Sequence, residues 1–529
     1  MIGFHIDMNI GQFTAAYLEK WLKEFAALGY DAIIWEVENN IQWQTCPECA
    51  SPDAFTKNEF KDILKLCKSL GMESIPLLQT LGHCEYVLKN SKYKYLAELP
   101  DKIDQYCPLH PQLTDFLHQW IDEYLDLFGP VRKFHIGADE ASNLGQCPRC
   151  NEFVQNHSLS SLYAQHINNV SQYLINRNIQ PIAWADMILK HPEEINKLSK
   201  KIIIADWMYD IYRGSGKVWV WGKGLQTNEQ LDDKTLDTFG RFLFPDGDEP
   251  GKEPETFYTA DFLAANGFAT ITCPSSSCYG DNVFAPRAYY HMKNIYDSIR
   301  KGCDDGISGS ILTSWTIRLF PWELQRMCIE MAPAIATNTA VTLEELEQMF
   351  LKKHFGVTDK SFFKACGSLS KSCLFSYNGS LGFDKDAEPV SPEHIDKTIK
   401  KLINDNLLEK ELDNCLKRLN EYEQGLNLLN DFMNVAKKGH EQIQYWQLAA
   451  RNLINRAQAA ICLLKNANQP TDADLQKIPS VLDALRQLKI ETRNMYEPTI
   501  KSSRLNDFLH WIYDAVEKDL YNGLKKLRS

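Results

Sequence analysis

Apolar residues along the first part of the chain alternate between two spacings. Short runs in which every second residue is apolar, as in a strand, are followed by longer stretches with apolar residues three or four positions apart, as in an amphipathic helix. The strands that this pattern predicts are Ile2–Asp7, Ala32–Val37, Ser74–Gln79, Lys133–Gly137, Pro181–Ala185, Ile202–Trp207, Ala269–Cys273 and Ile307–Trp315. Eight strand–helix units in succession predict an α/β fold, the (β/α)8 TIM barrel, with its active site at the carboxyl ends of the strands.

A doubly wound sheet would alternate in the same way, but no Gly-x-Gly-x-x-Gly follows the first strand. The segment Met208–Thr259 is polar and rich in glycine and aspartate, and we interpret it as an elaborated loop on the active face.

From about Val341 the alternation stops and helical periodicity takes over. Cys415–Leu464 and Ala473–Leu527 have the pattern of long amphipathic helices. We therefore predict two domains, a catalytic barrel over residues 1–340 and an α-helical bundle over residues 341–529. Nothing in the bundle resembles a catalytic constellation, so we expect it to be structural or to offer a surface for a homodimer.

Composition limits the partners. The chain has 529 residues, 44% hydrophobic and 24% charged, which is typical of a globular protein, and its net charge of −12 argues against nucleic acid or an anionic membrane as the main partner. No run approaches the ~20 apolar residues that a membrane span needs. The first residues enter a strand pattern with no basic region before them, and the 15 cysteines are too sparse for a disulfide scaffold, so we expect a reducing, cytoplasmic location.

The fourth predicted strand ends in two adjacent carboxylates. Phe134 and Ile136 alternate with small or polar residues, and Asp139 and Glu140 follow where the chain turns. Such a pair can divide two roles, with one acid protonated and the other ionised. The alternative is a helix that begins with an acidic first turn, which the helix dipole favours.

Other strand ends add polar and aromatic side chains. They are Asp7, Glu36, Glu38, His83, Trp184, Asp186, Trp207 and Trp315. A single tryptophan there is best explained by core packing, but three on different strands fit an aromatic box around the C–H face of a sugar or an acetamido methyl group. Carboxylates and tryptophans together indicate a carbohydrate site.

Four segments resemble one enzyme family. His135–Glu140 resembles the His-x-Gly-x-Asp-Glu signature of the family-20 glycoside hydrolases, the β-N-acetylhexosaminidases. The segments Ile75–Lys89, Pro181–Met187 and Ile311–Trp315 are similar to the third, fifth and eighth strand ends of the hexosaminidase D branch. The resemblance covers roughly residues 1–335 and leaves out the helical part.

The resemblance implies an exo-acting enzyme that removes terminal β-linked N-acetylgalactosamine or N-acetylglucosamine from small glycosides or glycans, without a catalytic cofactor. In this family the substrate's own acetamido oxygen attacks the anomeric carbon, giving an oxazolinium intermediate. Glu140 would be the general acid and base, and Asp139 would orient the acetamido N–H. Trp184, Trp207 and Trp315 would wall the pocket, and Tyr279 is the candidate to bond the carbonyl oxygen.

Two departures from the family concern the sugar hydroxyls. The first strand lacks the arginine that the family often has there, and Trp315-Thr316-Ile317 lacks the family's glutamate. We expect Asp7, Glu38 and His83 to contact the hydroxyls, with Arg318 as a weaker candidate. For His83 the alternative is a loop histidine that is bonded to the backbone.

Two Cys-x-x-Cys hairpins predict a metal site. Cys46 and Cys49 follow the second strand, and Cys147 and Cys150 follow the fourth. Four thiolates are the ligand set of a structural zinc ion, and loops two strands apart can meet on one face of a barrel. Disulfides within or between the hairpins, or plain loop cysteines, are the alternatives.

Two rival functions are open. Another substrate-assisted glycosidase, such as an O-linked N-acetylglucosaminidase, would usually carry two aspartates where this chain has Asp139 and Glu140. A catalytically silent glycan-binding barrel is the other rival, and the intact acidic pair argues against it.

Overall fold

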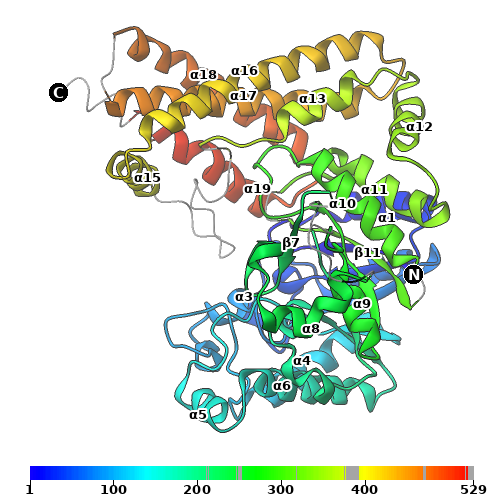
Figure 1. Ribbon diagram of the computed structural model, residues 1–529. Helices are drawn as coiled ribbons and strands as arrows, with labels where there is room; N and C mark the ends of the chain where they lie inside the picture. The colour runs from blue at the N-terminus through cyan, green and yellow to red at the C-terminus, as the bar shows by residue number, and fades with distance from the viewer. Residues whose placement is uncertain are drawn as a thin grey trace.

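The computed structural model describes residues 1–209, 211, 214–245, 247, 253–304, 306–316, 319–374, 376, 392–468, 472–518 and 520–521, with the backbone alone for 392–396, 468 and 472–474. Ile317 and Arg318 lie outside the described residues, so the expectation for Arg318 stays a prediction. A parallel barrel forms the lower part of Figure 1, and a group of long helices lies above it.

Eight parallel strands close into the predicted barrel. They are β1 (Ile2–Asp7), β2 (Ala32–Glu36), β3 (Glu73–Leu77), β4 (Lys133–His135), β5 (Gln180–Trp184), β6 (Ile203–Asp206), β9 (Ala269–Thr272) and β11 (Ile307–Ser314). Each strand pairs with the next in this order, and β1 pairs with β11, which closes the barrel with Phe4 opposite Leu312. The short strand β10 (Ser275–Ser277), which follows β9 in the chain, also pairs with β11.

The alternation within the strands separates two apolar cores. Phe4 and Ile6 of β1 point outward into the core shared with the surrounding helices. A smaller core fills the barrel itself and includes Ile34, Ile182 and Trp184. Because polar residues follow the last inward-facing apolar layer, the carboxyl ends of the strands carry the polar site.

The helices of the barrel part follow the strands as predicted. They are α1 (Ala15–Leu28), α2 (Lys57–Ser69), α3 (Glu85–Leu88), α4 (Leu113–Phe128), α5 (Pro148–Asn156), α6 (Leu159–Ile175), α7 (Asp186–Lys190), α8 (Asp233–Leu243), α9 (Tyr258–Ala265), α10 (Ala288–Gly302) and α11 (Trp322–Thr337). Helix α2 shows why such segments fold locally: Thr56 and Glu59 form a reciprocal capping box, and Phe60, Ile63 and Leu64 are buried on one face.

The predicted loop between the sixth and seventh barrel strands contains its own structure. A hairpin of β7 (Lys217–Val220) and β8 (Gly224–Thr227) precedes α8. Trp221, in the turn of this hairpin, packs edge-on against Trp207 at a ring separation of 4.6 Å. The insertion therefore lies on the active face.

After the barrel the described residues form helices: α12 (Leu343–Phe355), α13 (Ser361–Leu369), α15 (Pro392–Asn404), α16 (Leu408–Val435), α17 (His440–Asn468), α18 (Asp472–Tyr496) and α19 (Ser502–Leu509), which continues into a π-helical turn, His510–Asp514. The prediction of an unbroken helix over Cys415–Leu464 was wrong, because Gly439 takes a left-handed φ of 71° between α16 and α17. The second predicted helix, Ala473–Leu527, ends at Tyr496, two residues before Pro498, and Leu527 lies outside the described residues. The domain boundary at residue 340 and a dimer surface stay predictions.

The helical region is joined to the barrel near the ends of the first two strands. Ile500 forms an isolated antiparallel bridge with Phe13, and the backbone N–H of Thr14 donates to the carbonyl oxygen of Thr499 at 2.9 Å. The N–H of Ser503 donates to Asp53 Oδ2 at 2.6 Å. Helix α19 therefore sits beside the loops that follow β1 and β2 (Figure 1).

Across the described part of the chain, every helix is too short or too polar to cross a membrane.

Candidate active site

The turn after β4 sends its two carboxylates in different directions. Gly137, Ala138 and Glu140 have left-handed φ values of 61°, 71° and 48°. This tight turn buries Asp139 to 4% exposure, whereas the Glu140 side chain is 57% exposed. Left-handed φ is costly for Ala138 and Glu140, and such strain is typical of functional sites. Adjacent acids thus occupy a buried and an open environment.

His83 lies between the two carboxylates. Its Nε2 is 3.2 Å from Asp139 Oδ2 and 3.1 Å from Glu140 Oε2. The approach of this loop depends on Gly82, since a Cβ there would overlap the carbonyl oxygen of Asp139. The histidine predicted at the third strand end therefore contacts the acidic pair through its side chain; contact with a sugar hydroxyl stays a prediction.

A third carboxylate, that of Asp186 at the start of α7, is hydrogen-bonded to the backbone of this turn. Its Oδ2 accepts a 2.9 Å hydrogen bond from the backbone N–H of Glu140, and its Oδ1 accepts one of 3.3 Å from Trp207 Nε1. Burial, followed by the charge of Asp139, raises the pKa of Asp186 to about 8. Asp186 is therefore protonated near neutral pH, which limits the negative charge beside Asp139.

Aromatic side chains gather next to these acids. The rings of Trp184 and Trp315 lie 5.8 Å apart, and Trp184 is fully buried at the top of the barrel core. Tyr209 joins the third tryptophan to this pair: Trp315 Nε1 donates to the Tyr209 hydroxyl at 2.6 Å, and the Tyr209 and Trp207 rings lie 5.4 Å apart. Three tryptophans from separate strand ends and one tyrosine thus form a continuous group of neighbouring rings, which we call the aromatic cup (Trp184, Trp207, Tyr209 and Trp315).

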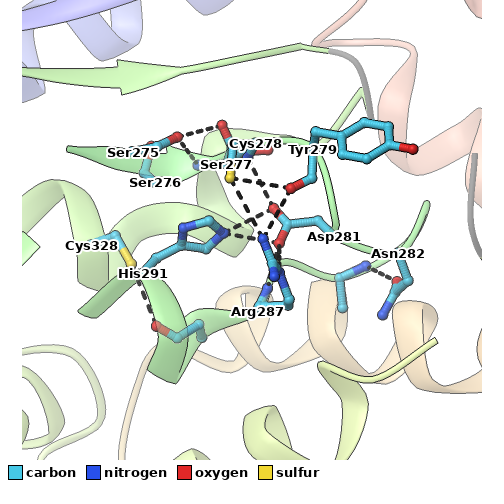
Figure 2. Close-up of polar contacts among 12 residues, drawn as sticks. Ser275, Ser276, Ser277, Cys278, Tyr279, Asp281, Asn282, Arg287, His291 and Cys328 are labelled. Atoms are coloured by element: carbon cyan, nitrogen blue, oxygen red, sulfur yellow. Dashed lines mark hydrogen bonds and ion pairs between the residues drawn. The ribbon is translucent and has the colours of Figure 1, made fainter. Parts of the chain in front are cut away.

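Tyr279, the tyrosine suggested by the sequence, has a different environment. Its side chain is 67% exposed, and Figure 2 shows it directed away from the buried group of Asp281, Arg287 and His291. That group anchors the loop: His291 Nε2 lies 2.9 Å and Arg287 Nε 3.0 Å from Asp281 Oδ1. Although burial opposes it, His291 and the Arg287 guanidinium lower the pKa of Asp281 to about 2. The predicted role of Tyr279 has weaker support than the same role for Tyr209.

On the opposite side of the barrel mouth, the acids are fully hydrogen-bonded. Asp7 Oδ1 and Oδ2 accept backbone N–H groups of Asn9 and Thr316, both at 2.8 Å. Glu36 accepts from Gln79 Nε2 at 2.8 Å and contacts His5 Nε2 at 2.9 Å. Burial opposes ionisation of Glu36, but His5 outweighs it and lowers the pKa. The predicted sugar contact of Asp7 stays a prediction, and the two backbone donors fix the orientation of its carboxylate.

Glu38 lines a small cavity that the helical region completes. The cavity has about 10 Å³ of free space, the room of roughly one water or hydroxyl group. Arg504 of α19 is only 6% exposed, and its Nε has no hydrogen-bond partner within the described residues, although Nη1 lies 3.6 Å from Asp507. The residues around this space are Asn9, Glu38, Asn39, Glu85, Tyr86, Lys89 and Arg504.

The cysteine prediction was half wrong. Cys46 and Cys49 form a disulfide with each other, one of the alternatives for the hairpins. Cys147 and Cys150 instead lie beside Cys107, whose Sγ is 3.6 Å from each of theirs. With Glu98 these three thiols form a group that could hold a metal ion, all four ligand atoms lying within 4.8 Å of one another. The cause of the error is that Cys107 stands alone in the sequence, without the Cys-x-x-Cys spacing.

Comparison with known proteins finds a similar enzyme family. Residues 32–218, which include the Asp139–Glu140 turn, match the model of the catalytic domain of glycosyl hydrolase family 20. Human hexosaminidase D is 25% identical over 359 residues, which is 65% of this chain and 64% of that protein. These matches make the barrel part of the chain similar to the catalytic domain of glycosyl hydrolase family 20. Bovine hexosaminidase D is 27% identical over 238 residues, 41% of this chain and 69% of its own length.

The chain is also similar to solved structures. The chitobiase of Flavobacterium johnsoniae aligns over 98% of this chain and 77% of its own, with 16% identity and a TM-score of 0.46. Dispersin B aligns over 64% of this chain and 98% of its own, also with 16% identity, and a TM-score of 0.44.

Sequence reasoning missed several residues of the candidate active site and of the cysteine group. Tyr209 lies two positions after Trp207, so the alternation of side chains in an extended segment after β6 could have indicated that both face the same side. Glu98, Cys107 and Arg504 carry no local signal, because each reaches its cluster through contacts between segments far apart in the chain.

Proposed function

We propose that this chain is an exo-acting β-N-acetylhexosaminidase that hydrolyses terminal β-linked N-acetylgalactosamine or N-acetylglucosamine with retention, using the acetamido group of the substrate as the nucleophile. The observation that carries the proposal is the pair of adjacent acids in opposite environments, Asp139 buried and Glu140 open, sharing contact with His83 beside the aromatic cup. The match of residues 32–218 to the family-20 catalytic domain supports the same reaction, because family 20 uses substrate assistance.

Asp139 would orient the acetamido group. Its Oδ1 is buried and has no hydrogen-bond partner among the described residues, and neither has the buried Nε1 of Trp184 in the cup. An unmet acceptor and an unmet donor are the complement of an amide, which offers one N–H and one C=O. An ionised Asp139 that accepts the acetamido N–H would also stabilise the positive charge that develops as the carbonyl oxygen attacks the anomeric carbon. Holding that oxygen close to the carbon removes much of the entropic barrier.

Glu140 would act as the general acid and then as the general base. Its exposure fits a group that must first reach the leaving oxygen and then a water molecule. The fixed backbone N–H, held by Asp186 at 2.9 Å, keeps the turn in place while the side chain works. All groups in this scheme belong to the chain or to the sugar, so catalysis calls for no cofactor.

Tyr209 would bond the acetamido carbonyl oxygen, the role first expected of Tyr279. Its hydroxyl accepts from Trp315 Nε1 at 2.6 Å and lies 3.3 Å from Thr313 Oγ1, which fixes it inside the aromatic cup. A hydroxyl that already accepts one hydrogen bond can still donate its own proton to a carbonyl oxygen.

The sugar hydroxyls would be recognised near the cavity formed by Asn9, Glu38 and Arg504. Arg504 supplies the cation that the first strand lacks, and its planar donors suit paired oxygen atoms. The cavity admits a group about the size of one hydroxyl, so it would read a single hydroxyl or hydroxymethyl group.

The test compares aryl glycosides that differ only at carbon 2. The N-acetyl-β-galactosaminide and N-acetyl-β-glucosaminide should be cleaved, while the matching 2-hydroxy glycosides should react at least about 10³-fold more slowly, since they lack the internal nucleophile. A thiazoline analogue of the cyclic intermediate should inhibit. Equal turnover of N-acetyl and 2-hydroxy substrates would reject substrate assistance, and binding of N-acetyl sugars without any turnover would favour the silent glycan-binding barrel.

A further inference from the structure

The three thiols of Cys107, Cys147 and Cys150 have the spacing of metal ligands. The Sγ of Cys107 is 3.6 Å from each of the other two sulfurs. In a tetrahedral zinc site with Zn–S bonds of about 2.3 Å, neighbouring sulfurs lie about 3.8 Å apart. The observed separations are close to this value, and they are far longer than the ~2.05 Å of a disulfide bond.

Glu98 supplies the fourth position and a second reason to infer a ligand. It is 2% exposed; its Oε1 accepts the backbone N–H of Cys147 at 2.9 Å, and its Oε2 has no hydrogen-bond partner within the described ranges. A buried carboxylate oxygen without a partner is costly, and a cation would satisfy it. Arg149 Nη1 donates to Cys107 Sγ at 3.8 Å and to the carbonyl oxygen of Leu109 at 3.3 Å, and no contact between Arg149 and Glu98 is recorded among the described residues.

We propose that Glu98, Cys107, Cys147 and Cys150 bind one zinc ion in a closed, structural site. Three soft sulfur ligands favour zinc over magnesium or calcium, and four protein ligands leave no open position for substrate or water. Binding displaces the protons of the three thiols, so the ion and its ligands carry less net charge than the four anions alone.

The site would clamp the two loops that build the catalytic turn. Glu98 and Cys107 belong to the loop after β3, in which Gln105 Oε1 accepts the N–H of Asn143 at 2.8 Å and the carbonyl of Asp104 accepts the N–H of Cys84 at 3.2 Å. Cys147 is the N-cap of α5 and follows Glu140 by seven residues. Zinc at this point therefore fixes His83 from one side and Asp139–Glu140 from the other, although it takes no part in the reaction.

Metal analysis of the full chain, purified with a reductant and without chelator, tests the site. We expect about one zinc per chain in the wild type and less than about 0.2 in Cys107→Ser and in Cys150→Ser, because each removes one of the three thiolates among the four ligands. Cobalt exchanged into the wild type should give thiolate-to-metal charge-transfer absorption, and X-ray absorption should report three sulfur ligands and one oxygen ligand.

Two controls separate this site from the one the sequence indicated. The double variant Cys46→Ser/Cys49→Ser should keep its zinc, and so should Cys328→Ser, which replaces a free buried cysteine of α11. Zinc lost from the Cys46/Cys49 variant but kept in Cys107→Ser would overturn the ligand set. Reduced wild-type protein without bound metal, or a disulfide between Cys107 and either neighbour in mass mapping, would overturn the proposal itself. None of these measurements depends on glycosidase activity.

Discussion

The barrel mouth carries two groups of acids that are held in different ways. The β1–β2 acids, Asp7 and Glu36, have a donor on every carboxylate oxygen, from backbone N–H groups, Gln79 and His5. The β4–β5 acids, Asp139, Glu140 and Asp186, include one unmet oxygen and one exposed side chain. Carboxylate oxygens that already have a donor are held in place by the protein, whereas the second group offers an oxygen without a partner. We therefore expect the chemistry on the β4–β5 side and positioning roles for Asp7 and Glu36.

Substitution of Asp139 or Glu140, the adjacent acids after β4, should have the largest effect on turnover. Glu140→Gln should lower kcat about 10²–10⁴-fold with a poor leaving group and recover on an activated aryl glycoside, because protonation of the leaving oxygen then matters less. Asp139→Asn should lose a similar factor on both substrates, since it stabilises charge in the acetamido group. Steady-state kinetics over a series of leaving groups measures this. Parallel responses of the two variants would contradict the division of roles.

The tyrosine inside the aromatic cup should matter more than the exposed one. Tyr209→Phe removes the donor to the carbonyl oxygen and should lower kcat by about 10²-fold. Tyr279→Phe, the matched control, should stay within about twofold, as a surface change. A large loss in Tyr279→Phe with little change in Tyr209→Phe would reverse our assignment.

Arg504, which lines the cavity beside Glu38 on the β1–β2 side, should affect substrate binding more than turnover. Arg504→Lys keeps the charge but loses the planar donors, so KM should rise about 10-fold while kcat changes little. The effect should be smaller on a deoxy sugar that lacks the hydroxyl concerned. Arg493→Lys is the control, because Arg493 bonds Asn506 within the helical region. An equal loss on the complete and deoxy sugars would show that Arg504 only supports the fold.

The smallest effects should be on stability. The contribution of Asp186, on the β4–β5 side, should change with pH in the opposite direction to that of Glu36, on the β1–β2 side. Between about pH 4 and 8 the folded protein keeps on Asp186 a proton that the unfolded chain has lost, so this residue makes folding less favourable as pH rises. Asp186→Asn removes that penalty, and its Tm relative to the wild type should rise by about 2–4 °C from pH 5 to 8. Thermal denaturation at both pH values checks it.

Glu36→Gln should show the reverse trend. The lowered pKa of Glu36 means that its stabilising contribution is present above the unfolded value of 4.5 and is lost as pH falls through the folded value. The variant should therefore be less stable than the wild type by about 1–3 kcal/mol at pH 7, since His5 loses a charged partner, and the deficit should shrink near pH 4. The same pH trend in both variants would refute the contrast between the two groups.

The sequence predicted the barrel and its strand ends well because both depend on local periodicity. Each predicted strand overlaps an observed strand, and the predicted carboxyl ends of the strands lie close to the observed ones at the barrel mouth. What depends on contacts between distant segments could not be predicted. Cys107 has no second cysteine at Cys-x-x-Cys spacing, and Arg504 comes from a helix far along the chain. The long helices were predicted from continuous amphipathic patterns, but the chain breaks them at Gly439 and before Pro498.

The bridge between Phe13 and Ile500 changes what counts as the smallest stable unit of this protein. A shortened protein that stops at residue 340 would leave Phe13, 1% exposed in the full chain, without one of its neighbours, and would remove the wall that Arg504 gives to the Glu38 cavity. Attempts to minimise or graft the barrel should therefore carry α19 along with it.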